Sequence, residues 1–173
     1  TKFGNWIDDS LFLQWAQYTK KLDQERSLGE ILSALMEPSE DIRSTQIIRD
    51  LYTNKSIECV WSGETLTTFQ VDHAIPYSLW KNNDLWNLLP CQSTLNGQKG
   101  NKLPSKDLIL KRKDCIINYW EQYQKVHTNY FEYQLRKSLG VTTNHNWQHK
   151  TFLSFLETVS RLSVYRIGDI WEY

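Results

Sequence analysis

An acid and an imidazole stand side by side in this sequence, Asp72 and His73, at the end of an apolar stretch and shortly before Pro76. In a strand, neighbouring side chains point to opposite faces, so the two could serve different tasks at one edge. A carboxylate binds a hard cation such as Mg²⁺, and an imidazole that is neutral near pH 7 can accept a proton from water. The pair alone is weak evidence, because it equally describes a histidine whose nitrogens are satisfied by local hydrogen bonds.

The pattern becomes specific further along the chain. Asn87 follows 14 positions after His73, and Asn96 follows nine positions after Asn87, in a segment rich in glycine and lysine. With these residues in this order, residues 59–104 resemble the HNH (His-Asn-His) endonuclease family. The ββα-metal motif of that family has Asp-His on a first strand, Asn at the start of a second strand, and His or Asn on the following helix.

The resemblance implies a role for each residue. Asp72 and Asn96 match the metal ligands of the family. His73 matches the general base that activates water, and Asn87 matches the residue that supports the motif and orients this base. One divalent ion is expected, most simply Mg²⁺ with Mn²⁺ as the alternative, because two protein oxygens leave room for waters and phosphate oxygens in an octahedral shell. Such an ion and such a base together suit phosphodiester hydrolysis.

Two features depart from the pattern of the family. Many members bind a structural zinc through paired CxxC motifs, whereas Cys59 has no such partner. We therefore expect Ile57, Cys59 and Trp61 to pack in the core, where apolar contacts replace the zinc. The third position of the family name is Asn96 and not His, a variant that also occurs in the family.

Basic residues follow the motif closely. Six of them lie between positions 97 and 113, against one acid, Asp107. We expect Lys99 and Lys102 to contact nucleic-acid phosphates on either side of the cut. The basic residues from Lys106 to Lys113 fit either that role or an ordinary solvated helix face. Asp84 is either a further metal ligand or, more simply, a loop residue.

The elements that must position the motif form a small mixed centre between helical flanks. Residues 1–56 and 105–173 show helical apolar periodicity, and residues 57–104 contain short β-prone pieces. We predict an α+β fold, a ββα-metal core embedded in flanking helices, as one domain over residues 1–173. Helix N-caps are predicted at Asp8-Asp9-Ser10, Ser27 with Glu30, Ser39 and Ser105, and helix ends at Pro38 and Gly140. The last two helices are predicted over about 129–139 and 151–164.

Composition restricts the kinds of partner and location that the chain can have. The 20 basic and 20 acidic side chains cancel, so any nucleic-acid site must be a local patch. No apolar run long enough for a membrane span and no signal-peptide pattern is present, so we expect no membrane partner. The three cysteines lack the spacing of a disulfide or zinc framework, as expected for reduced thiols in the cytoplasm.

The sequence therefore predicts a metal-dependent endonuclease that cuts double- or single-stranded DNA. The alternatives are a binding module that keeps the ββα shape without cutting, and a structural helical domain that matches the motif by chance. No helix shows an evident set of base-reading side chains, so targeting is expected from a larger protein or a guide complex. By analogy, the favoured setting is a prokaryotic defence system of the restriction, anti-phage or CRISPR kind.

Overall fold

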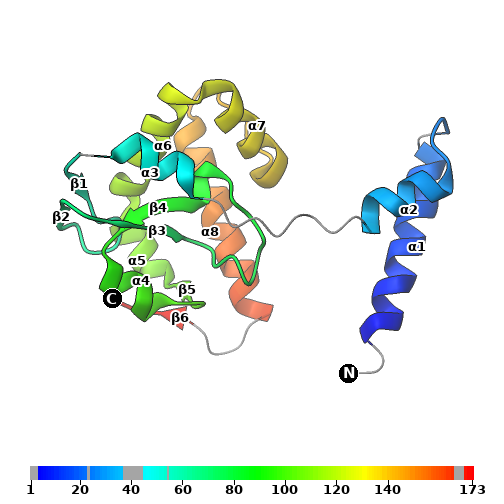
Figure 1. Ribbon diagram of the computed structural model, residues 1–173, viewed down its shortest axis with the longest axis horizontal. Coiled ribbons are helices and arrows are strands. Elements are labelled where there is room, and N and C mark those ends of the chain that lie inside the picture. Colours follow the sequence, from blue (N-terminus) through cyan, green and yellow to red (C-terminus); the bar gives the residue numbers. More distant parts are fainter. Residues whose placement is uncertain (1–3, 23, 37–44, 54, 166–169) are drawn as a thin grey trace. The chain divides into compact units, whose positions relative to one another are not determined.

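The computed structural model describes residues 4–22, 24–36, 45–53, 55–165 and 170–173. The chain divides into two compact units, Thr1–Ile42 and Arg43–Tyr173 (Figure 1). The described residues form helices and short paired strands, which confirms the predicted α+β fold. That the whole chain forms a single domain stays a prediction. In the described ranges, no helix has both the length and the apolar character needed to cross a membrane.

The first unit contains two helices that pack against each other, α1 (Gly4–Leu22) and α2 (Leu28–Met36). The predicted capping box of α2 is confirmed, because Glu30 N donates to Ser27 Oγ at 3.2 Å and Ser27 N donates to Glu30 Oε2 at 2.7 Å. The predicted cap at Asp8-Asp9-Ser10 is wrong. A cap residue must leave helical geometry, and α1 is already continuous there. The signals at Pro38 and Ser39 lie outside the described residues.

The second unit is built around a strand pair and a short helix. Strand β3 (Gln70–His73) pairs antiparallel with β4 (Leu88–Cys91), which leads into α4 (Ser93–Lys99). The register places Asp72 opposite Leu89 and His73 opposite Leu88. A single 3-10 turn, η1 (Leu85–Asn87), ends directly before β4. The β3–β4–α4 order is the ββα arrangement predicted from the sequence.

Further elements surround this centre (Figure 1). They are α3 (Gln46–Tyr52), the hairpin of β1 (Ile57–Glu58) with β2 (Thr65–Leu66), the parallel pair of β5 (Leu103–Pro104) with β6 (Ile170–Trp171), and α5 (Lys106–Lys111), α6 (Lys113–Val126), α7 (Thr128–Leu139) and α8 (Trp147–Tyr165). Two predicted signals are confirmed: Ser105 Oγ accepts from Leu108 N at the start of α5, and Gly140 ends α7 at a φ of 68°. Helix α8 begins four residues before the predicted position 151.

An aromatic cluster joins α6, α7 and α8 to the strand pair. Trp120, Tyr123 and Phe131 are fully buried, and their rings meet neighbouring rings largely edge to face. Two polar groups of the cluster reach the chain segment that carries the motif. Trp120 Nε1 donates to the carbonyl of Trp86 at 2.8 Å, and the Tyr123 hydroxyl donates to the carbonyl of Leu88 at 2.9 Å. The helical layer thus fixes the backbone on both sides of Asn87.

Candidate active site

Asp72 and His73 occupy the end of β3 and make separate sets of contacts. Asp72 Oδ1 accepts from Lys99 Nζ at 2.9 Å, and Asp72 Oδ2 accepts from Trp61 Nε1 at 2.8 Å. Lys99 Nζ also donates to the carbonyl of His73 at 2.8 Å. Relative exposures are 2% for Asp72, 1% for His73 and 0% for Lys99. A buried carboxylate is therefore paired with a buried ammonium group beside the predicted base.

The burial of Lys99 argues against the phosphate contact expected for it. A phosphate contact requires a side chain that reaches solvent, and Lys99 extends instead from the end of α4 to Asp72. Asn96 and Lys99 are three residues apart on one helix, a spacing that places both side chains on one face. If Asn96 faces β3, Lys99 must do so too. In this arrangement its contribution is to neutralise the charge of Asp72.

His73 is oriented by a residue that the sequence did not single out. Its Nε2 lies 2.9 Å from Asn83 Oδ1, and the ring of Tyr77 packs edge-on with its centroid 5.3 Å away. An amide oxygen can only accept a hydrogen bond, so with the Asn83 amide in this orientation Nε2 carries the proton. Nδ1 is then the basic nitrogen of the imidazole. This tautomer is the one that a general base acting through Nδ1 needs.

Asn87 fixes the loop that follows His73. Its Oδ1 accepts from Ile75 N at 2.7 Å, and its Nδ2 donates to the carbonyl of Ile75 at 3.0 Å and to that of Asn82 at 3.2 Å. The backbone carbonyl of Asn87 also accepts from Ala74 N at 2.8 Å. These four bonds hold both sides of the loop together at its base. The contacts agree with the supporting role implied for Asn87.

Asn96 lies on α4, which packs against β3, and its side chain is partly buried. Its Nδ2 donates to Gln70 Oε1 at 2.7 Å, which leaves Oδ1 as the atom suited to a cation. The carboxylate of Asp72 has lone pairs beyond the two that accept from Lys99 and Trp61. Asp72 and Asn96 thus offer the oxygen donors that Mg²⁺ or Mn²⁺ prefers, and the site fits such an ion by ligand type.

In the part of the chain that the structure describes, no group of three or more His, Cys, Asp or Glu side chains is placed to bind a metal together. A closed structural metal centre is therefore absent from these residues. An oxygen site with two protein ligands, completed by water and substrate, needs no such group. The ammonium group of Lys99 beside Asp72 Oδ1 disfavours a second cation on that carboxylate, so weak metal affinity is expected.

The hairpin of β1 and β2 is held by apolar packing and by Arg112. Cys59 and Trp61 are buried as predicted. The sequence analysis did not single out Arg112 for this role. Its Nε donates to the carbonyl of Val60 at 2.7 Å, and its guanidinium also pairs with Glu58. Gly63, at a φ of 84°, allows this approach, because a Cβ there would lie 2.9 Å from Arg112 Nη1.

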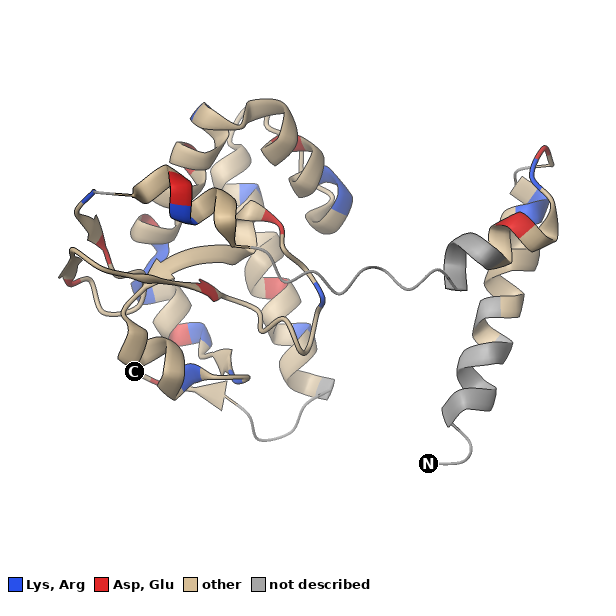
Figure 2. Cartoon of the chain, in the orientation of Figure 1, with Lys and Arg blue, Asp and Glu red and all other residues tan. Residues whose placement is uncertain are grey.

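The basic residues after the motif divide into two groups. Lys102, Lys106 and Lys111 are exposed, so phosphates can reach them. Arg112 is bound to the hairpin, and Lys113 Nζ lies 5.4 Å from the ring centroid of Phe152. Acidic and basic segments are interspersed along the ribbon of this unit (Figure 2). The run of basic residues in the sequence is therefore not one continuous basic surface.

Asp84 serves the loop before η1. Its Oδ2 accepts from Asn82 Nδ2 at 2.8 Å and from Trp86 Nε1 at 3.1 Å, and its backbone N donates to Asn82 Oδ1 at 2.9 Å. These local bonds match the loop interpretation of Asp84. They also place Asn83, between the two bonded residues, where its amide meets His73.

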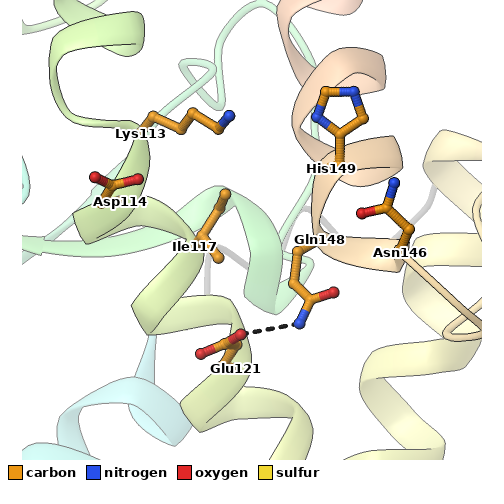
Figure 3. A pocket seen from close by; sticks show the side chains of 7 residues that line it. All are labelled: Lys113, Asp114, Ile117, Glu121, Asn146, Gln148 and His149. Carbon is orange, nitrogen blue, oxygen red and sulfur yellow. Dashed lines mark hydrogen bonds between the residues drawn. The ribbon is translucent and has the colours of Figure 1, made fainter.

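A separate hollow of about 560 Å³ lies between α6 and α8 (Figure 3). Gln148 Nε2 donates to Glu121 Oε1 across it at 2.9 Å. The lining mixes both charges, with Lys113, Asp114, Ile117, Glu121, Asn146, Gln148 and His149. None of the predicted site residues belongs to this set, so the hollow and the ββα site are distinct features.

Comparison with known proteins agrees with the geometry. Residues 50–105 match the family model of the HNH endonuclease. A stretch of 74 residues is 31% identical to the CRISPR-associated endonuclease Cas9 of Streptococcus mutans and 28% identical to that of Listeria innocua. The stretch is 43% of this chain and 5% of each relative, so the chain spans only a small part of the curated relatives it matches. The HNH resemblance is confirmed for the segment that holds Asp72, His73, Asn87 and Asn96.

Proposed function

We propose that the HNH segment makes this chain a metal-dependent endonuclease that hydrolyses DNA phosphodiester bonds. The observation that carries the proposal is the hydrogen-bonded set around β3, in which Asn83 and Asn87 fix the ring and the backbone of His73. A base held in one tautomer beside a carboxylate is what hydrolysis requires. The match of residues 50–105 to the HNH endonuclease model supports the same conclusion.

His73 Nδ1 takes the proton of the attacking water in this proposal. The bond from Nε2 to Asn83 Oδ1 stabilises the positive charge that the ring then acquires. Because His73 is 1% exposed, the segment from Tyr77 to Asn83 has to shift before water and phosphate reach the ring. Substrate binding and a local opening of this segment are therefore coupled.

Asp72 and Asn96 would hold one divalent ion, for which we propose Mg²⁺ with Mn²⁺ as a substitute. When bound, the ion would supply positive charge to the scissile phosphate and the departing oxygen. Lys99 keeps the carboxylate of Asp72 charged and fixed by its short contact at 2.9 Å. Of Lys99 and Lys102, only the exposed Lys102, just beyond α4, is proposed to contact a phosphate.

For the biological setting we propose a prokaryotic defence system, with DNA as substrate and a larger protein or guide complex as the source of targeting. The names of the two relatives, both CRISPR-associated endonucleases, support this setting. We propose a cytoplasmic location as well, since Cys59, Cys91 and Cys115 are all free thiols.

The second candidate is a nucleic-acid-binding module that keeps the ββα shape without cutting. The buried ion pair favours this candidate, because both oxygens of Asp72 already accept hydrogen bonds from protein donors. Cleavage is the measurement that separates the two candidates, since both predict binding to DNA.

The deciding experiment incubates the full chain with supercoiled plasmid and with single-stranded DNA, in Mg²⁺, in Mn²⁺ and in EDTA. We expect metal-dependent nicking or linearisation, and a loss of at least about a hundredfold in His73→Ala, because a general base is removed. His149→Ala, an exposed histidine outside the motif, is the matched control and should cut at the rate of the unaltered chain. Equal loss in both variants, or cleavage that persists in EDTA, would contradict the proposal.

A further inference from the structure

Two hollows in the Arg43–Tyr173 unit adjoin at Gln70. The smaller, of about 320 Å³, is lined by Thr45, Arg49, Gln70, Val71 and Asn96. The larger, of about 520 Å³, is lined by Thr65, Leu66, Thr67, Thr68, Phe69, Gln70, Gln92, Ser93 and Thr94. Gln70 lines both hollows, and the two together are named the Gln70 groove below. It runs from α3 past the start of β3 to the first residues of α4.

The lining of the Gln70 groove contains no acidic residue, and its apolar members are Leu66, Phe69 and Val71. Its other residues, apart from Arg49, are threonine, serine, glutamine and asparagine, whose hydroxyl and amide groups can form hydrogen bonds. These groups, together with arginine, donate the hydrogen bonds that proteins use most on phosphate and sugar oxygens of nucleic acids. The chemistry of the lining suits an extended, negatively charged backbone.

Arg49 supplies the positive charge of the groove. It lies on the exposed side of α3, and its Nε donates to Thr45 Oγ1 at 3.1 Å. Arginine has five N–H donors in a planar fork, so this single bond leaves the outer nitrogens able to meet a phosphate in a paired geometry. The bond to Thr45 also restricts the orientation of the guanidinium, which lowers the entropy lost on binding.

The Gln70 groove meets the candidate active site at Asn96, which lines the smaller hollow. Gln70 Oε1 accepts from Asn96 Nδ2 at 2.7 Å, so the shared residue of both hollows contacts the proposed metal ligand directly. Gln70 also begins β3, two residues before Asp72. A strand that follows the groove would bring one of its phosphates to Asn96.

We propose that the Gln70 groove binds the sugar–phosphate backbone of the DNA strand that is cut, with Arg49 contacting a phosphate beside the scissile one. The proposal rests on the proposed nuclease function and deepens it by naming the substrate path. Contacts to the backbone hold the strand in position without reading its bases. Affinity through the groove is therefore independent of base sequence.

The test measures binding separately from cleavage. Fluorescence anisotropy with a short labelled single-stranded DNA is recorded for the full chain in a His73→Ala background, in EDTA. Arg49→Gln should weaken binding roughly three- to tenfold and reduce the slope of log affinity against log salt by about 0.7, the value for one lost contact to a single strand. Arg136→Gln, which alters an exposed arginine on α7 outside the groove, should change neither quantity.

A second pair of variants tests the groove without Arg49. Thr68→Glu places a negative charge in the lining and should weaken DNA binding about tenfold or more, whereas Thr142→Glu, at an exposed site outside it, should not. Equal effects within either pair, no DNA binding by the background protein, or stronger binding to a matched RNA would overturn the proposal. Arg49-dependent binding by a chain that never cuts DNA would instead overturn the nuclease proposal and leave the groove standing.

Discussion

The ββα centre and the helical layer behind it bury their side chains on different principles. In the centre, the buried residues Asp72, Asn87 and Lys99 are polar, and each makes directed bonds to a particular partner. In the layer of α6, α7 and α8, the buried side chains are mainly aromatic and aliphatic. Their aromatic rings meet largely edge to face. The buried polar residues of the centre are thus stabilised by directed hydrogen bonds and charge pairing, and the buried side chains of the layer by close packing.

This difference determines what a substitution does. Removal of one polar partner in the centre leaves another polar group buried and unsatisfied, which costs more than the bond itself was worth. Removal of a ring from the layer leaves a cavity, whose cost depends on how far the neighbours relax. We therefore expect changes in the centre to alter both stability and chemistry. Removal of a layer ring that makes no hydrogen bond to the motif segment, such as Phe131, should alter stability alone.

Lys99→Met is expected to have the largest combined effect on stability and cleavage. The variant leaves the carboxylate of Asp72 buried without a counter-charge, so the free energy of unfolding should fall by about 3–5 kcal/mol. Urea denaturation followed by circular dichroism measures this loss. Cleavage should fall in the fraction that remains folded, because Lys99 also holds the carbonyl of His73.

The double variant Asp72→Asn/Lys99→Met separates charge from packing. It removes both charges, so most of the stability lost in Lys99→Met should return, and the double-mutant cycle should show strong coupling. It should not regain cleavage, since a proposed metal ligand is altered. A double variant no more stable than Lys99→Met would show that packing of the lysine chain, and not the ion pair, stabilises the centre.

Phe131→Ala is expected to cost about 3–5 kcal/mol as well, without an effect on chemistry. Phe131 is fully buried, and its ring packs against Tyr123 at 6.3 Å and Trp147 at 5.8 Å between centroids. Denaturant titration gives the stability. Cleavage is measured where the variant is still folded and should match that of the unaltered chain. A tenfold loss of cleavage by the folded variant would mean that the helical layer also positions the active-site residues.

The same contrast explains what the sequence could predict. Ser27 with Glu30, Ser105 and Gly140 act on residues three to five positions away, so their roles as caps and stops were readable. The motif was readable too, because its residue order resembles that of the HNH family, and β3 pairs with β4 as the resemblance implies. The caps and stops are local signals, and local geometry follows from sequence spacing.

The contacts that escaped prediction join distant residues. Lys99 meets Asp72 across 27 positions, and Arg112 meets Val60 across 52. A lysine or arginine with a buried partner resembles, in its sequence neighbourhood, one on a solvated helix face, so the sequence predicts a phosphate contact for Lys99. The shared helix face of Asn96 and Lys99 was the one available signal. The role of Asn83 could not be predicted either, since its bond to His73 depends on the path of an irregular loop.

Asn87→Ala is expected to have the smallest of these effects on stability and the most informative effect on cleavage. The variant loses three side-chain bonds and leaves Ile75 N buried without its acceptor, which should lower the free energy of unfolding by about 2 kcal/mol. Cleavage should fall in the folded protein, because the backbone next to His73 is no longer fixed. Asn118→Ala, at an exposed position on α6, is the control for both measurements. Full activity in Asn87→Ala, at whatever stability, would mean that the directed bonds of the centre serve folding and that Asn87 does not have the supporting role that the motif implies.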